Sequence, residues 1–185
     1  MQILNYTLLP TPFGTLGMVW QSSVASVKVQ RVFLPSPPAE AEGRIVASYA
    51  GSKPASCPPI DELCQQVGRF LQGQAVQFDM QVLALDQCSP FQRRVLLAES
   101  QIPRGWVSTY GRIAKQIACP GGARAVGRAL ANNPFPIIIP CHRAIRFHGS
   151  LGGFQGGLGM KRALLQLEGV EFSGVDRVVM NRVYY

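Results

Sequence analysis

Residues 109–132, TYGRIAKQIACPGGARAVGRALAN, contain two short helical patterns with a turn between them. Thr109 is suited to cap the first pattern, in which Ile113 and Ile117 stand one helical turn apart. Residues 119–122, CPGG, favour a turn, and the second pattern ends at two asparagines and a proline. Two short helices joined by a tight glycine turn predict a helix-turn-helix, which many DNA-binding proteins use.

The second of these helices combines small residues with two arginines. Its small residues are Ala123, Ala125, Gly127 and Ala129. Arg124 and Arg128 are four positions apart, so they share one face of the helix and can contact phosphates together. One interpretation is a thin helix that lies against nucleic acid. The other is a helix packed tightly on its neighbour, with both arginines in solvent.

Another helix start precedes this motif. Ser89 is a good N-cap, Pro90 suits the first helical position, and Gln92 stands where a capping box has its second member. The buried side of this helix would be supplied by Val95, Leu96 and Leu97, and Pro103 and Gly105 would end it.

The first half of the chain has mixed patterns. Residues 27–32, VKVQRV, alternate with period two as a half-buried strand does, and residues 77–86, QFDMQVLALD, alternate again. Residues 60–72 have helical spacing, with Asp61 placed to cap them. Together the patterns predict an α+β fold, with an N-terminal domain over residues 1–85 and a helical C-terminal domain over residues 86–185.

The overall composition narrows the class of protein. The 185 residues are 47% hydrophobic and only 15% charged, which indicates a folded core. The net charge is +8, and a nucleic acid is the usual polyanionic partner of so basic a protein. The five cysteines have no C-x-x-C spacing, which argues against a zinc ribbon or a disulfide framework and favours the reducing cytoplasm, or the nucleus of a eukaryote. We find no signal peptide and no apolar run long enough to span a membrane.

Residues 136–143, PIIIPCHR, place a cysteine beside a histidine. The flanking prolines exclude a helix and predict an extended, buried segment that leads to Cys141. A buried cysteine is most often a small apolar side chain. His142 and Arg143 favour another interpretation, because nearby cationic groups stabilise the thiolate, which is the nucleophilic form.

A carboxylate further along could complete a relay with this pair. Glu168 stands in the last turn of a predicted helix, where it opposes the helix dipole and therefore needs a reason to be present. Orienting a histidine would be such a reason, which makes Cys141, His142 and Glu168 a candidate set of nucleophile, base and orienting group. Residues 149–157, GSLGGFQGG, form a glycine-rich loop that can approach a flat ligand closely but does not match a phosphate loop.

These motifs together resemble the O6-alkylguanine-DNA alkyltransferases. The resemblance rests on PCHR, the preceding Asn133-Pro134, the TYGRIA and ARAVGRAL helices, and the glycine-rich loop that leads to Leu167-Glu168-Gly169. It runs in order from about Phe91 to Gly169, and residues 11–19, TPFGTLGMV, are similar to the first strands of the family.

The resemblance implies a fold and an activity. The N-terminal domain would hold a small antiparallel sheet with a helix in a ribonuclease H-like arrangement, and the second helix of the C-terminal motif would enter the minor groove of double-stranded DNA. The protein would flip O6-alkylguanine out of the duplex and transfer the alkyl group irreversibly to Cys141, acting once and as a monomer, with O4-alkylthymine as a further candidate substrate. DNA contacts are implied for Thr109, Tyr110, Ala123, Arg124, Ala125, Gly127 and Arg128.

It also implies roles for single residues. His142 would accept the thiol proton through a water, Glu168 would orient His142, and Asn133 would brace the turn at the cysteine. Arg124 would fill the gap left by the flipped nucleotide, and Tyr110 would help rotate the base and donate a proton to the departing guanine. The base pocket would be lined by Pro140, Ala144, Phe154 and Gln155, where many members have tyrosine in place of Phe154. A wider basic patch is predicted from Arg112, Lys115, Arg128, Arg143 and Arg146, and His148 has no assigned role.

No cofactor and no metal are expected. Some relatives bind zinc in the N-terminal domain through cysteines and a histidine, but the first 56 residues here contain neither. Three other functions remain open: a damage-binding protein that flips the base without transfer, a cysteine hydrolase, and a transcription factor. The first class usually has tryptophan where this chain has Cys141, and the second leaves the helix-turn-helix unexplained. Loss of alkyl transfer in Cys141→Ser would separate the alkyltransferase from the others.

Overall fold

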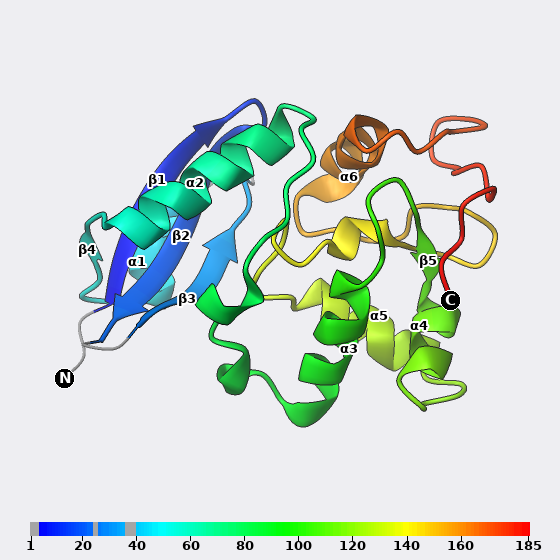
Figure 1. Cartoon of the computed structure of the whole chain (residues 1–185), viewed down its shortest axis with the longest axis horizontal. Coiled ribbons are helices and arrows are strands. Elements are labelled where there is room, and N and C mark those ends of the chain that lie inside the picture. The colour runs from blue at the N-terminus through cyan, green and yellow to red at the C-terminus, as the bar shows by residue number, and fades with distance from the viewer. Residues whose placement is uncertain (1–3, 24–25, 36–39) are drawn as a thin grey trace. The chain divides into compact units, whose positions relative to one another are not determined.

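The computed structural model describes residues 4–23, 26–35 and 40–185. The chain forms two compact units (Figure 1). The first comprises Met1–Ala84 with Pro134–Ile138, and the second comprises Leu85–Asn133 with Ile139–Tyr185. Residues 134–138 return to the first unit, where the Pro134 carbonyl accepts a hydrogen bond from the Val32 amide at 2.7 Å. The predicted domains, residues 1–85 and 86–185, do not include this return of the chain to the first unit.

A four-stranded sheet organises the first unit (Figure 1). Strands β1 (Leu4–Thr11), β2 (Gly14–Ser22) and β3 (Val27–Phe33) are antiparallel, which confirms the strand predicted at residues 27–32. The short β4 (Lys53–Pro54) pairs in parallel with β1, so the order is β3-β2-β1-β4 and the sheet is mixed, not wholly antiparallel as expected. Parallel neighbours require a crossover connection, and the segment that contains α1 (Ala41–Ser48) supplies it.

Helix α1, which the sequence patterns do not predict, packs on this sheet. Gly17 in β2 makes the close approach possible, because a Cβ at that position would lie 2.6 Å from Ile45 Cδ1. Ile45 is fully buried and shares a core cluster with Tyr6, Val19 and Phe33 from the three long strands. The missing side chain of a strand glycine thus marks where the helix contacts the sheet.

Two local predictions in the first half of the chain are wrong. Helix α2 (Pro58–Leu71) has Cys57 at its N-cap without a side-chain bond, and Asp61 lies inside the first turn. Residues 77–86 contain η1 (Met80–Val82) and the start of η2 (Leu85–Gln87) in place of a strand, and only Leu83 between them bridges to Val29 of β3. The Asp79 side chain accepts a hydrogen bond from the Gln81 amide and so stabilises a turn where alternation predicted extension.

The second unit is mainly helical. Helix α3 (Pro90–Ser100) begins as predicted, with the Ser89 hydroxyl accepting from the Gln92 amide. The predicted capping box does not form, because the Gln92 side chain donates to the carbonyls of Ala129 and Asn132. Gln92 therefore ties α3 to the end of α5 (Ala123–Ala131), a tertiary use of a residue that the local pattern assigns to its own helix.

The two-helix motif is present as α4 (Tyr110–Gln116) and α5. The Thr109 hydroxyl accepts from the Arg112 amide, 3.3 Å away, which confirms the predicted cap. Between the helices, Gly121 has φ +80°, a conformation that glycine adopts without steric cost. Short parallel strands β5 (Ser108–Thr109) and β6 (Ala144–Ile145) then join the start of α4 to the segment that follows the cysteine.

The remainder of the second unit encloses a small apolar core. The 3-10 turn η3 (Cys141–Arg143) precedes β6, and α6 (Gly157–Leu167) follows the glycine-rich loop. The core cluster contains Val107, Ile145, Leu151, Leu165, Val170 and Val178. Within residues 4–23, 26–35 and 40–185, no helix is long and apolar enough to cross a membrane.

Candidate active site

Cys141 lies at the start of a tight turn. It is buried and opens η3, so the cysteine and histidine do not belong to the extended segment expected from the flanking prolines. The preceding isoleucines are buried as predicted, but Ile137 has φ +75°, a strained conformation for a β-branched residue. The Asn133 side chain donates to the Ile139 carbonyl, 3.2 Å away, and thereby braces the turn that carries Cys141.

The environment of the thiol disfavours its ionisation. Burial raises the pKa of Cys141 to about 12, and the Glu99 carboxyl group adds to this rise. A hydrogen bond from Asn133 and the nearby charge of Lys161 act in the opposite direction. The cysteine is therefore a protected thiol in the free protein, and its activation depends on the polar groups around it.

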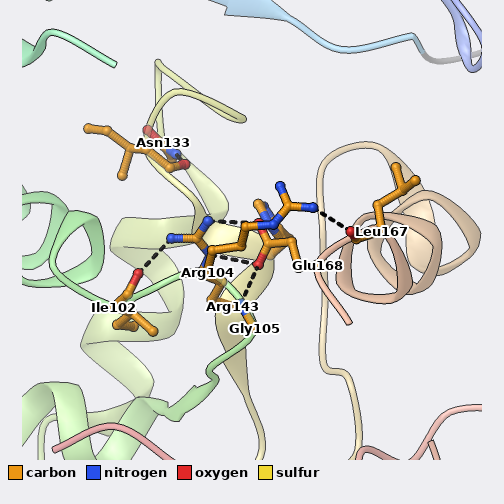
Figure 2. A network of polar contacts seen from close by, with 9 residues as sticks. Ile102, Arg104, Gly105, Asn133, Arg143, Leu167 and Glu168 are labelled. Carbon is orange, nitrogen blue, oxygen red and sulfur yellow. Dashed lines mark hydrogen bonds and ion pairs between the residues drawn. The ribbon is translucent and has the colours of Figure 1, made fainter. Parts of the chain in front are cut away.

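His142, Arg143 and Glu168 form a largely buried polar cluster. Figure 2 shows the contacts of Arg143 with Glu168 and Ile102. The His142 Nε2 atom lies 2.9 Å from Glu168 Oε1, which brings together the two residues that the relay hypothesis pairs. Arg143 donates to both oxygens of Glu168, at 2.8 and 2.7 Å, and to the Ile102 carbonyl at 2.6 Å. Arg143 is thus an internal partner of Glu168 and not part of a basic surface patch, because a bidentate carboxylate contact orders its guanidinium.

The groups around His142 determine its protonation state and its tautomer. Burial opposes the ionisation of Glu168, but the His142 contact and the Arg143 guanidinium lower its pKa to about 2. Burial lowers the pKa of His142, so we assign a neutral imidazole at neutral pH. Since the carboxylate can only accept, Nε2 carries the proton and Nδ1 is the basic nitrogen. The arrangement fits a general base whose tautomer Glu168 sets.

A cavity of about 390 Å³ opens beside the cysteine. It is lined by Tyr110, Gly127, Leu130, Ala131, Cys141, Arg146, Gly152, Gly153, Phe154 and Gln155. Gly152 has φ +70°, and a Cβ there would lie 2.8 Å from the Tyr110 hydroxyl. The glycine-rich loop therefore packs closely against Tyr110, and both line the cavity.

The predicted base-pocket residues divide into two groups. Phe154 and Gln155 line the cavity, the Phe154 ring meets His142 edge-on at 6.4 Å, and Gln155 donates to the Asn133 carbonyl at 2.8 Å. Pro140 and Ala144 are buried outside the lining, and the Ala144 carbonyl already accepts a 2.6 Å bond from Lys161.

The outer face of α5 is polar and hollowed. Arg124, Ala125 and Arg128 are exposed, and they contribute to a second hollow of about 510 Å³ that reaches the start of α3. Val126 and Leu130 are buried on the opposite side, so the helix packs on its neighbours through that face, and contact of its exposed face with nucleic acid stays a prediction. Thr109 is buried by its capping role, whereas Arg112 and Lys115 on α4 and Arg146 are exposed. His148 is exposed and its ring meets that of Phe147.

Two buried charged residues near the cysteine are absent from the sequence-based site. Lys161 and Glu99 have no exposed surface. Each occupies a position on the apolar face of its helix, beside Leu164 and Leu165 in α6 and after Val95 and Leu96 in α3. A charged residue on the apolar face of a helix could have identified Lys161 and Glu99 as candidate site residues. Burial of an unpaired charge is costly, so such a residue needs a reason to be there.

Known proteins are similar to this chain in sequence and in fold. Residues 90–170 match the family described as 6-O-methylguanine DNA methyltransferase, DNA binding domain. The methylated-DNA–protein-cysteine methyltransferase of Methanothermobacter thermautotrophicus is 46% identical over 121 residues, which cover 64% of this chain and 68% of that protein. This chain belongs to the methylated-DNA–protein-cysteine methyltransferase family.

Solved structures extend the methyltransferase likeness beyond the matched region. The O6-methylguanine methyltransferase of Mycobacterium tuberculosis is 34% identical with a TM-score of 0.74, covering 90% of this chain and 93% of that one. The structure of Mycobacterium tuberculosis OGT in complex with DNA is 34% identical, with a TM-score of 0.71 and coverage of 89% and 92%. The α+β class is therefore confirmed over both parts of the chain.

Proposed function

We propose that this protein repairs DNA by moving the alkyl group of O6-alkylguanine to its own Cys141. The observation that carries the proposal is a buried cysteine at the wall of a cavity, next to a histidine bonded to a carboxylate. The relatives named for this reaction, and one solved in complex with DNA, support both the substrate and the partner. Such a substrate places the protein in the cytoplasm, or in the nucleus of a eukaryotic cell.

The transfer begins with the proton of Cys141. Nδ1 of His142 accepts it through a water molecule, and Glu168 stabilises the imidazolium that results. The thiolate attacks the alkyl carbon, so a carbon–sulfur bond forms as the bond from that carbon to O6 breaks. Guanine departs as an anion and takes a proton from Tyr110, which lines the cavity together with Cys141. The phenolate of Tyr110 then regains a proton from solvent as the imidazolium of His142 releases one. The product is a thioether on Cys141, and no group nearby is suited to cleave it, so the protein acts once.

The target base must leave the duplex to reach the thiol. Unstacking costs a few kcal/mol, and contacts to the vacated position offset part of that cost. Arg124 is exposed on α5 and occupies the position that the family resemblance assigns to the gap-filling side chain. The small residues beside it, Ala125 and Gly127, allow the helix backbone to approach the narrow minor groove.

Phe154 sets the character of the cavity wall. Its ring packs edge-on against His142 and provides an apolar surface for a purine, without the hydroxyl that many members have here. We therefore assign orientation of the base to backbone groups of the loop, including those around Gln155, and apolar contact to Phe154.

The test is intact mass spectrometry of the protein mixed with a duplex that contains one O6-methylguanine. We expect a gain of one methylene per protein, located on Cys141 by peptide mapping, and no gain in Cys141→Ser. Several guanines restored per protein would contradict single use. Tight binding of the duplex with an unchanged mass would instead establish a damage-binding protein.

A further inference from the structure

The glycine-rich loop is fixed to the segment of the cysteine at two neighbouring residues. Lys161 Nζ donates to the Gly153 carbonyl at 3.3 Å and to the Ala144 carbonyl at 2.6 Å, so one buried ammonium joins the loop to the start of β6. The ring of Phe154 meets the ring of His142 edge-on, with 6.4 Å between their centroids. The loop is therefore ordered where it faces the cavity.

Gln155, the next residue of the loop, is fixed to the segment that precedes the cysteine. Its Nε2 donates to the Asn133 carbonyl at 2.8 Å. The Asn133 side chain donates to the Ile139 carbonyl at 3.2 Å, and that carbonyl also accepts from the Cys141 amide at 2.8 Å. A short chain of hydrogen bonds thus connects the Gln155 carboxamide to the backbone of the nucleophile, and both residues line the same cavity.

The carboxamide of Gln155 has a hydrogen-bond donor to spare. Its nitrogen carries two hydrogens, and the Asn133 carbonyl takes one of them. Among the described residues the second hydrogen has no acceptor. Because the Asn133 carbonyl requires a donor, this bond also determines which end of the carboxamide lies there. Gln155 is half-buried at the cavity wall, so the second N–H is available to a molecule in the cavity.

The cavity offers few other polar side chains. Besides Gln155 they are Tyr110, Cys141 and Arg146. Tyr110 gives up its proton in the transfer steps above, and Cys141 is the nucleophile. Arg146 is exposed, so water and salt screen its charge. Gln155 is thus the neutral donor of the cavity that is already held in place and that need not lose its proton to act.

We propose that Gln155 is a further catalytic residue, whose free side-chain N–H donates a hydrogen bond to O6 of the alkylated guanine. The role rests on the proposed function. As the thiolate forms its bond to the alkyl carbon, the electron pair of the breaking bond stays on O6, and negative charge develops there. Gln155 keeps its proton, and Tyr110 still neutralises the guanine. A donor held in place before the reaction stabilises such developing charge without reorganisation.

A donor at O6 has a consequence that a purely structural glutamine does not have. In S6-methyl-6-thioguanine a sulfur atom replaces O6, and the methyl group still passes to Cys141. Sulfur is a weak hydrogen-bond acceptor, so the N–H of Gln155 helps this leaving group much less. If Gln155 only held Asn133 and the turn of the cysteine, its loss would slow transfer from oxygen and from sulfur equally.

The test uses Gln155→Met, which keeps the length of the side chain and removes the donor. Single-turnover methyl transfer is followed by intact mass with saturating duplex that contains either O6-methylguanine or S6-methyl-6-thioguanine. We expect the variant to be slower than the wild type by about 100-fold on the oxygen substrate and nearly equal on the sulfur substrate. Equal slowing on both substrates would overturn the proposal, as would an unchanged rate on O6-methylguanine.

The matched control is Gln166→Met, which changes an exposed glutamine near the end of α6. It should transfer from both substrates at the wild-type rates. The wild type itself tests the proposed function, because a protein that gains no methyl group on Cys141 is not an alkyltransferase. A wild type that transfers, together with a Gln155→Met protein that is equally fast, would contradict the role of Gln155 alone.

A second measurement leaves Gln155 intact and so guards against a variant that does not fold. Cys141→Ser lacks the nucleophile and should form a stable complex with the duplex that contains O6-methylguanine. A crystal structure of this complex should place Gln155 Nε2 within about 3.2 Å of O6. A carboxamide that lies beyond hydrogen-bonding distance of O6 would overturn the proposal.

Discussion

Glu168 is the residue on which the buried charges of the site converge. It accepts hydrogen bonds from His142 and twice from Arg143, and its side chain has no exposed surface. Removal of one partner of a buried ion pair leaves the other uncompensated, at a cost of about 3 kcal/mol. The orientation of the histidine and the stability of the fold therefore depend on the same carboxylate.

This dependence predicts a particular acid sensitivity. The pKa of Glu168 is about 2 in the folded protein and lies near 4.5 ordinarily, so its contribution to stability is present above about pH 4.5 and is lost as the pH falls towards 2. Thermal unfolding followed by circular dichroism should show the wild type losing stability over that interval. Glu168→Gln should be less stable at neutral pH and should change less with acid.

The control for this prediction is Glu171→Gln, which removes an exposed carboxylate three residues away. It should keep the acid dependence of the wild type. An identical loss of stability in Glu168→Gln and in the wild type between pH 4.5 and pH 3 would show that another carboxylate is responsible.

At the scale of elements, the glycine-rich loop is positioned by close contact with α4. Gly152 combines φ +70° with a place where a Cβ would lie 2.8 Å from the Tyr110 hydroxyl. We expect Gly152→Ala to destabilise the protein by about 1–2 kcal/mol through backbone strain. Because the new methyl group would displace Tyr110 from the cavity, alkyl transfer should slow more than DNA binding weakens.

The adjacent glycine provides a matched control. A Cβ at Gly153 would meet nothing within 4 Å, and its φ is not in the left-handed region. Gly153→Ala should therefore transfer the alkyl group at nearly the wild-type rate. The measurements are single-turnover transfer to the protein and duplex affinity, and equal slowing in the two variants would contradict a specific contact between Gly152 and Tyr110.

At the scale of the whole molecule, the net charge of +8 is the property that matters for a DNA partner. Each phosphate contact releases counterions, so the logarithm of the binding constant falls linearly with the logarithm of salt concentration. We expect Arg128→Ala, on the exposed face of α5, to weaken binding to all sequences and to reduce the slope by about one.

Arg69→Ala is the control for the loss of DNA affinity expected in Arg128→Ala. Arg69 is also exposed and carries the same charge, but it belongs to α2 in the other unit. Binding can be measured by fluorescence anisotropy of a labelled duplex across a series of salt concentrations. Arg69→Ala should show the same dependence of the binding constant on salt as the wild type. A similar reduction in both variants would mean that net charge, and not the face of α5, determines affinity.

The sequence by itself determined the features that depend on near neighbours. The caps at Ser89 and Thr109 join a side chain to an amide three residues away, so local order is sufficient to predict them. The alternation at residues 27–32 and the two-helix motif were predictable for the same reason. Cys141, His142 and Glu168 were also identifiable as candidate site residues, because their residue types suit nucleophile, base and orienting group and the chain resembles a known family.

Only the tertiary structure decided what lies between elements. It brought His142 to within 2.9 Å of a carboxylate 26 positions away, and it turned Gln92 and Arg143 to partners that the local patterns do not contain. It also replaced an expected strand by turns at residues 80–87 and buried Glu99 and Lys161 beside the cysteine. The free energy of a buried charge depends on the groups that surround it in space, and the spacing of residues along the chain does not specify those groups.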